Sequence, residues 1–80
     1  MASKYDPLHR FLSTDPALPL TLSFGQVEQI LGESLPKSAR ELPAWWGNEK
    51  APTHTQSMAW LMAGLKAKPD FLRQRVTFSN

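Results

Sequence analysis

The sequence contains no cysteine. This absence excludes a disulfide framework, a thiolate metal site and a cysteine nucleophile. No apolar run approaches the roughly 20 residues that span a bilayer, and no apolar signal core follows Met1. We therefore expect a cytoplasmic protein that does not interact with a membrane.

The usual catalytic motifs are also missing. The four glycines are scattered singly, so there is no glycine-rich phosphate loop and no nucleophile elbow. The two histidines, His9 and His54, lack the spacing of metal ligands. A hydrolase would need His54 to converge with Asn48 and Glu49 in a cleft. We expect no enzymatic activity, no cofactor and no bound metal.

Charge is present but unevenly distributed. The 80 residues carry a net charge of +2, and 41% of them are hydrophobic, enough for the thin core of one domain over residues 1–80. Residues 1–35 have a net charge of −2 and residues 36–80 a net charge of +4. This asymmetry indicates an anionic partner, although a small domain also acquires such a distribution by chance.

Local signals in the first half predict a helix, a strand and a second helix. Asp6, followed by proline, is the expected cap of the first helix. Residues 20–24 alternate apolar and polar, as a half-buried strand does. Ser23 and Gln26 have the spacing of a capping box, so the strand leads directly into the second helix. Gly32 suits the left-handed residue that ends it.

The second half predicts a helical turn over 36–41, an irregular segment over 42–53, and a helix from Thr53–Thr55 to about Leu65. Residues 75–78 alternate as a strand does, and 67–71 are its expected partner in a hairpin. Because this partner contains a proline, it is expected at the edge of the sheet.

The helix that ends near Leu65 has two dissimilar sides. Its expected core stripe comprises Met58, Leu61, Met62 and Leu65. The opposite side contains Gln56, Trp60 and small residues. If that side is exposed, Gln56 is placed to read an adenine edge in a major groove. If the helix is packed on both sides, Trp60 belongs to the core.

These elements predict an α+β fold, a small winged helix-turn-helix-like domain with three to four short helices, a short strand and a C-terminal β-hairpin. One feature opposes this topology. The connection from Gly32 to Thr55 is much longer than the turn of three or four residues in a helix-turn-helix.

Adjacent tryptophans mark the irregular segment. Trp45 and Trp46 must point in different directions, so one is expected in the core and the other partly exposed. An exposed indole would stack on a base for about 1–3 kcal/mol. Alternatively, both rings cover the ends of helices.

Basic residues in the second half are the expected phosphate contacts. Lys66 and Lys68 follow the last helix, and Arg73 and Arg75 lie on the expected wing. The full set of residues expected to bind nucleic acid comprises Arg40, Trp46, Asn48, Lys50, His54, Gln56, Trp60, Lys66, Lys68, Arg73 and Arg75.

A series of short motifs resembles a small, functionally uncharacterised domain family of bacteria and their phages. The motifs are Tyr5-Asp6-Pro7-Leu8, Leu22-Ser23-Phe24, Ile30-Leu31-Gly32, Leu35-Pro36, Ser38-Ala39-Arg40, Trp45-Trp46, Asn48, His54, Ala59-Trp60-Leu61, Ala63-Gly64 and Val76-Thr77-Phe78. The resemblance implies that seven polar and aromatic residues form one cluster: Ser38, Arg40, Trp45, Trp46, Asn48, His54 and Trp60. It also implies a DNA-associated accessory role, because members are fused to nuclease-like modules. The chain departs from the family pattern in two places. Leu65 stands where an aromatic residue is usual, and the terminal hairpin is shorter and contains Pro69.

Two functions remain open from the sequence. The first is a nucleic-acid-binding accessory module, with DNA as the expected partner. The alternative is a small protein-interaction module, such as a phage or mobile-element factor that binds and modulates a host enzyme. Its support is the content of tryptophan and arginine, which anchor many protein interfaces.

Overall fold

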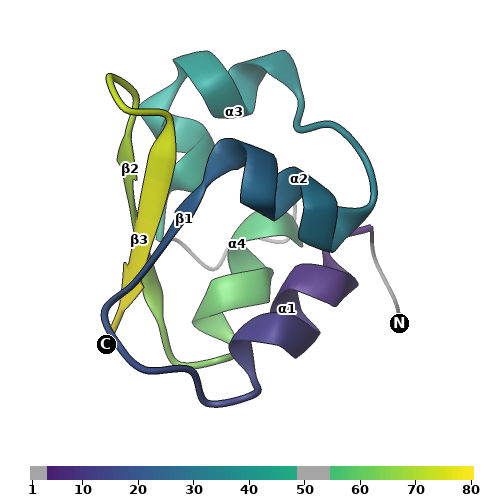
Figure 1. Ribbon diagram of the computed structural model, residues 1–80, viewed down its shortest axis with the longest axis vertical. Helices are drawn as coiled ribbons and strands as arrows, with labels where there is room; N and C mark the ends of the chain where they lie inside the picture. The colour runs from purple at the N-terminus through teal and green to yellow at the C-terminus, as the bar shows by residue number, and fades with distance from the viewer. Residues whose placement is uncertain (1–3, 49–54) are drawn as a thin grey trace.

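The computed structural model describes residues 4–48 and 55–80. This part of the chain forms four α-helices, one 3-10 helix and three β-strands, which confirms the α+β class (Figure 1). In chain order they are α1 (Asp6–Leu12), β1 (Leu20–Ser23), α2 (Phe24–Leu31), α3 (Lys37–Glu41), η1 (Pro43–Trp46), α4 (Thr55–Leu61), β2 (Lys66–Asp70) and β3 (Arg75–Ser79).

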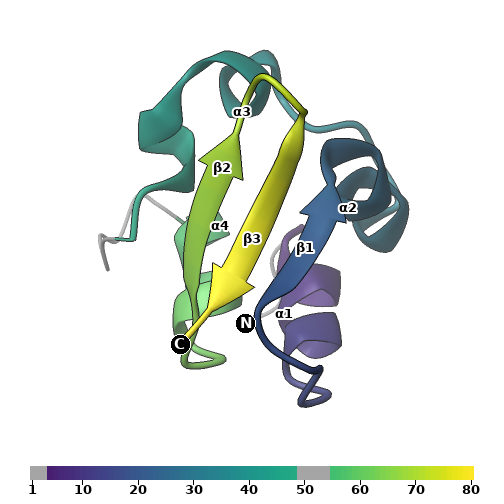
Figure 2. The ribbon, with the colours of Figure 1, turned by 60° about the vertical axis from the view of Figure 1, so that its left-hand side comes forward.

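The three strands form one antiparallel sheet in the order β1-β3-β2. Figure 2 shows α1 and α4 behind the sheet, so the helices cover only one of its faces. The expected C-terminal hairpin is confirmed, with β2 beginning one residue earlier than predicted. Pro69 lies in this edge strand opposite Val76. An edge position suits proline, which has no N–H to donate to a neighbouring strand.

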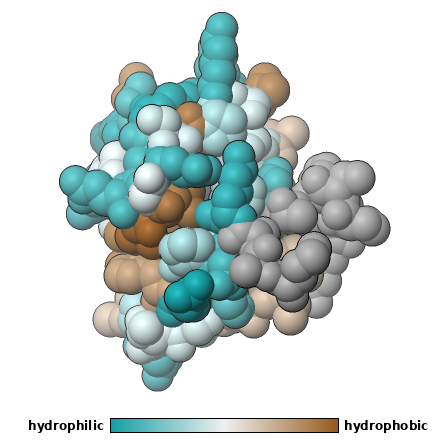
Figure 3. Space-filling model, turned by 90° about the vertical axis from the view of Figure 1, so that its right-hand side faces the viewer, coloured by the Kyte–Doolittle hydropathy of each residue, from teal (hydrophilic) through white to brown (hydrophobic). Residues whose placement is uncertain are grey.

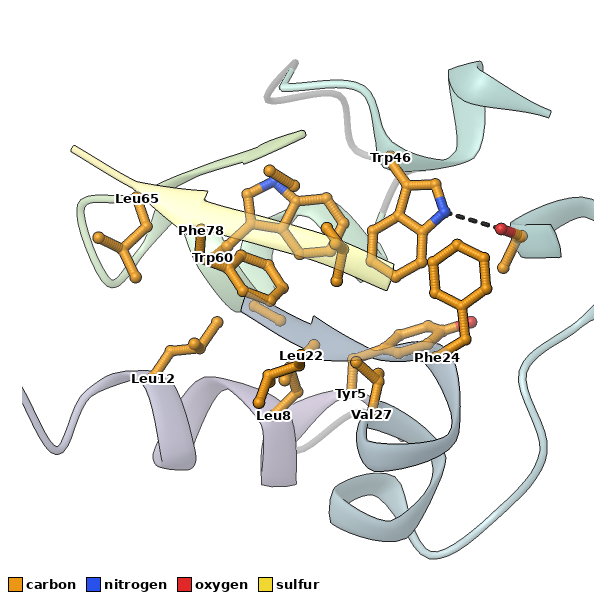
Figure 4. Packing of buried hydrophobic residues seen from close by; sticks show 14 of the residues in the cluster. Tyr5, Leu8, Leu12, Leu22, Phe24, Val27, Trp46, Trp60, Leu65 and Phe78 are labelled. Carbon is orange, nitrogen blue, oxygen red and sulfur yellow. Dashed lines mark hydrogen bonds between the residues drawn. The ribbon is translucent and has the colours of Figure 1, made fainter. Parts of the chain in front are cut away.

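Aromatic rings fill the space between the sheet and the helices (Figure 4). The ring of Trp46 is stacked on Phe24 and on Trp60, with centroid distances of 5.4 and 5.7 Å. Phe78 from β3 lies 5.9 Å from Trp60. All four side chains are at most 1% exposed. Since such rings bury about 150–250 Å² each, they dominate the core of this small domain.

The predicted junction of β1 and α2 is confirmed. The Ser23 hydroxyl accepts a hydrogen bond from the Gln26 amide at 3.0 Å, and the Gln26 side chain accepts one from the Ser23 amide at 2.8 Å. Gly32 follows α2 with φ of 78°. The two ends of the helix are therefore satisfied by residues that the sequence indicated.

The sequence predicts Asp6 as the cap of α1, and the structure shows that this prediction is wrong. Tyr5 occupies the cap position and makes no side-chain capping bond, because α1 begins one residue earlier than predicted. The Asp6 carboxylate instead binds Arg10 one turn along the helix, with an Nη2–Oδ2 distance of 2.8 Å. Pairs at this spacing face each other on a helix.

The prediction for α4 was wrong in its length and in most of its core stripe, since only Leu65 of the four expected residues is buried, and it lies beyond the end of the helix. The helix ends at Leu61, and Gly64 reverses the chain with φ of 78°. Its buried residues are Ser57, Ala59 and Trp60, whereas Met62 is 63% exposed. The large indole faces the other aromatic rings, and the small Ala59 side chain lets α1 approach closely. His9 of α1 donates from Nδ1 to the Ala59 carbonyl oxygen at 3.2 Å.

The surface over the helices is mostly hydrophilic. Figure 3 shows a hydrophobic area with hydrophilic side chains above it and weakly hydrophobic ones below it. Among the described residues, the exposed large apolar side chains are Phe11 on α1 and four residues in connections between elements: Leu18, Leu42, Met62 and Leu72. Leu18 and Met62 line one groove, whereas single exposed apolar residues such as the others are normal on a protein surface.

Candidate nucleic-acid interface

The face of the sheet that the helices leave uncovered is entirely polar. Alternate residues of a strand point to opposite faces, and here the inward ones include Leu22, Ala67, Val76 and Phe78, which are all buried. The outward residues of the three strands are Thr21, Ser23, Lys66, Lys68, Asp70, Arg75, Thr77 and Ser79. We call these eight residues the outer sheet face.

Two lysines distinguish the outer sheet face from the rest of the described surface. Every other described lysine and arginine lies within 4.0 Å of a carboxylate. Lys66 and Lys68 form no ion pair with any described residue, and both are exposed. They are two residues apart on one strand, which separates their Cα atoms by about 6.6 Å. The two ammonium groups are therefore available to an external anion.

Arginines extend this positive charge to the β2–β3 turn. Arg73 Nη1 lies 3.3 Å and Arg75 Nε 3.8 Å from Asp70 Oδ2. Asp70 Oδ1 also accepts a hydrogen bond from the Arg73 amide at 3.2 Å. That amide bond and the Arg73 side chain lower the pKa of Asp70. Because one carboxylate holds two guanidinium groups, this end of the face keeps a net positive charge.

Arg40 has a structural role. Its Nη2 lies 2.8 Å from Glu28 Oε2, and its Nη1 donates to Gln74 Oε1 at 3.3 Å. Glu28 also accepts a hydrogen bond from the Leu35 amide at 2.8 Å. The bond from Arg40, followed by the bond from Leu35, lowers the pKa of Glu28. Arg40 thus links α2, α3 and the β2–β3 turn, and it does not project freely toward a ligand.

Trp46 and Trp60 lie in the core and are only 1% and 0% exposed, so neither ring is available to stack on a base. Trp46 donates from Nε1 to the Ala39 carbonyl at 2.8 Å, the bond drawn in Figure 4. Trp45 is half-buried, as predicted for one member of the pair. We therefore remove Trp46 and Trp60 from the expected nucleic-acid contacts.

Asn48 and Gln56 are occupied by internal hydrogen bonds. Asn48 Oδ1 accepts from Trp60 Nε1 at 2.9 Å and from the Ala67 amide at 2.8 Å. Gln56 Nε2 donates to the Trp45 carbonyl at 3.3 Å, so it is not free to read a base edge. Of the cluster that the family resemblance implied, Trp45, Trp46 and Trp60 are in ring contact, and Asn48 binds Trp60 at the edge of the core. Arg40 instead binds Glu28 and Gln74. Lys50 and His54 lie outside the described residues.

The sequence prediction missed the hydroxyl groups of the outer sheet face. Thr21 Oγ1 and Thr77 Oγ1 lie 2.8 Å apart across β1 and β3. Thr77 is also opposite Lys68 in the register of β2 and β3. The alternation of residues 20–24 and 75–78 could have indicated these hydroxyl groups, but we used it only to predict strands. Lys68 was predicted within the hairpin strand over 67–71, and Lys66, expected just before it, also lies within β2.

Other kinds of site are not found in the part of the chain that the structure describes. Residues 4–48 and 55–80 contain no group of three or more histidine, aspartate or glutamate side chains able to hold a metal ion. In the same residues, no helix has the length and apolar character needed to cross a membrane.

Comparison with known proteins places the chain in a family. The family model described as Domain of unknown function (DUF7662) matches residues 5–80. The chain belongs to this family. The match to DUF7662 includes every element of the fold and the whole outer sheet face. No curated protein and no solved structure matches the chain.

Proposed function

We propose that this domain is a nucleic-acid-binding accessory module that holds duplex DNA against the outer sheet face. The observation that carries the proposal is that Lys66 and Lys68 lie on the open, wholly polar face of the sheet. Neither lysine has a carboxylate partner among the described residues. Arg73 and Arg75 continue the positive charge toward the turn. Phosphate oxygens are the natural partners of such a surface.

The chemistry of the outer sheet face favours the duplex backbone over unpaired bases. Proteins that bind single strands stack bases on exposed aromatic rings. None of the outward residues of β1, β2 and β3 is aromatic. Lysine, arginine and hydroxyl groups instead contact phosphates, which carry no sequence information directly. We therefore expect binding that depends strongly on salt and weakly on sequence.

We further infer that the fold is a divergent winged helix-turn-helix. The order of helices and strands supports this inference, as does the terminal hairpin, whose strand β3 pairs with both β1 and β2. The long connection between α2 and α4 is the divergent part. Because α4 is largely buried, the proposed contact surface is the sheet and its hairpin rather than a recognition helix.

A salt titration tests the proposed function. We expect the chain to bind a 20-base-pair duplex at low salt, with an affinity that falls linearly with salt on logarithmic axes. The double variant Lys66→Gln/Lys68→Gln should reduce the magnitude of that slope by about 2, one unit for each lost phosphate contact. The matched control is Lys37→Gln, an exposed lysine that is paired with Glu41 on α3.

Two results would overturn the proposal. One is the absence of duplex binding at low salt by a folded wild-type chain. The other is a double variant that binds like the wild type, since the two unpaired lysines would then contribute nothing. Circular dichroism of each variant checks that the fold is intact.

A further inference from the structure

A groove of about 430 Å³ lies at the end of the domain away from the β2–β3 turn. Figure 1 shows the loop after α1 and the loop before β2 together at the lower end of the molecule, with the turn at the upper end. The groove is lined by Leu12, Ser13, Asp15, Pro16, Leu18, Met62, Ala63, Leu65 and Asn80. None of these residues belongs to the outer sheet face, although Leu65 and Asn80 are the chain neighbours of Lys66 and Ser79 on that face.

Two exposed apolar side chains flank this groove. Met62 is 63% exposed and Leu18 is 37% exposed, whereas Leu12 and Leu65 behind them are buried. An apolar group that enters the groove would cover Met62 and Leu18 and remove their surface from water, which is favourable. The unbranched Met62 side chain also adapts readily to different partners.

Asp15 supplies the charge of the groove. It is the one aspartate or glutamate among the described residues that forms no ion pair with a described residue. Its φ is 62°, in the left-handed region that non-glycine residues seldom adopt. The loop therefore holds an unneutralised carboxylate at the groove. Charge complementarity calls for a cation on the occupant.

We propose that this groove binds a peptide segment of a partner protein in which a leucine-like side chain is next to an arginine. The apolar side chain packs against Leu18 and Met62, and the guanidinium group pairs with the Asp15 carboxylate. Arginine suits this role because its planar fork matches a carboxylate and its stem is apolar. The domain then holds a protein at the groove and presents the outer sheet face, which extends from the groove to the β2–β3 turn, to DNA.

Peptide titrations followed by NMR test this proposal without nucleic acid. The probe is an N-acetylated, C-amidated hexapeptide with a central Leu-Arg pair among glycine and serine residues. We expect saturable shifts of the backbone amides of residues 12–18 and 62–65. The Leu-Glu and Ala-Arg versions of the peptide should bind more weakly. Asp15→Asn should lower the affinity for the Leu-Arg peptide about three- to fivefold, as expected for one ion pair at the surface.

The variants are chosen to separate binding from folding. Asparagine tolerates the left-handed conformation as well as aspartate does, so Asp15→Asn keeps the loop. Met62→Gln removes an exposed apolar contact with little effect on the core, and should also weaken binding. The matched control is Asp6→Asn on α1, which should leave the peptide affinity unchanged.

Several outcomes would overturn the inference. These are the absence of shifts at the groove, equal affinity for the Leu-Arg and Leu-Glu peptides, and an unchanged affinity of Asp15→Asn. Shifts at the groove that depend only on protein concentration would identify a second copy of the chain as the occupant, which also contradicts it. The titration contains no DNA, so its failure leaves the proposed function untouched.

Discussion

The side-chain amide of Asn48 pairs with the backbone of Ala67 as a further β-strand would. Oδ1 accepts a hydrogen bond from the Ala67 amide at 2.8 Å, and Nδ2 donates one to the Ala67 carbonyl at 3.1 Å. Both backbone groups of Ala67 therefore point away from β3, toward the edge of the sheet. The next residue that faces this edge in the same way is Pro69, which has no N–H. Asn48 and Pro69 together close the edge of β2 against pairing with another chain.

Replacing Asn48 should therefore cost stability. Asn48→Ala removes three hydrogen bonds, including the one that the Trp60 indole N–H donates to Asn48 Oδ1. We expect the free energy of unfolding to fall by about 1–2 kcal/mol, because each intramolecular hydrogen bond contributes about 0.5–1.5 kcal/mol and water can replace part of what the exposed Asn48 side chain supplies. Urea unfolding followed by tryptophan fluorescence measures this loss. Gln29→Ala, an exposed position on α2, should change stability by less than about 0.5 kcal/mol, and a similar small change in Asn48→Ala would contradict the structural role.

The contrast between Ser23 and Asn48 explains how far the sequence could predict this structure. The capping box of Ser23 and Gln26 is formed within one turn of chain, so its spacing alone identified it. Asn48 bonds to a residue 19 positions further on, and only the folded chain brings the two together. Sequence reasoning therefore found a polar residue beside two tryptophans and interpreted it as a binding group.

The buried side of α4 is a second feature that the sequence alone could not predict. Its apolar residues lie on both sides of the helix, so their spacing alone did not decide which side is buried. The decision comes from tertiary packing: Trp60 is 0% exposed because Trp46 and Phe78 surround it. The outer sheet face was predictable in part, since alternation places Lys66 and Lys68 together once their segment is known to be a strand.

Acid should destabilise the domain through Glu28. The Arg40 hydrogen bond, followed by that of the Leu35 amide, lowers the pKa of Glu28 in the folded chain. A carboxyl group with a lowered pKa contributes stability above its unfolded value of 4.5, and this contribution is lost as the pH falls through its folded value. We therefore expect Glu28→Gln to be less stable than the wild type near pH 7. The difference should shrink as the pH falls below about 4.5.

Unfolding by urea over a series of pH values measures this difference. The matched control is Glu41→Gln, which removes an exposed carboxylate 3.8 Å from Lys37. We expect its stability to follow that of the wild type at every pH. If Glu28→Gln and the wild type were to lose stability in parallel below pH 4.5, the bonds from Arg40 and Leu35 would not stabilise the ionised carboxylate.

Fluorescence quenching should distinguish core tryptophans from a stacking surface. Trp46 and Trp60 are 1% and 0% exposed, and Trp45 is half-buried. Acrylamide should therefore quench Trp45→Phe less than Trp46→Phe or Trp60→Phe, since only the latter two retain the partly exposed ring. Saturating duplex DNA should leave the emission of Trp45→Phe unchanged. Quenching of that variant by DNA would show that a core ring reaches the nucleic acid, contrary to the structure.

Releasing the arginines from Asp70 should strengthen the binding of duplex DNA. Asp70→Asn removes the carboxylate near Arg73 and Arg75 but keeps an oxygen that can accept the Arg73 amide bond. The outer sheet face then has one more net positive charge and two guanidinium groups free for phosphates. We expect tighter binding at low salt and a steeper salt slope, by about one to two units. The charge-matched control is Asp6→Asn, which frees Arg10 on α1. If the two variants bound DNA with equal affinity, the affinity would depend only on the overall charge of the chain. That result would contradict the assignment of the outer sheet face as the DNA contact.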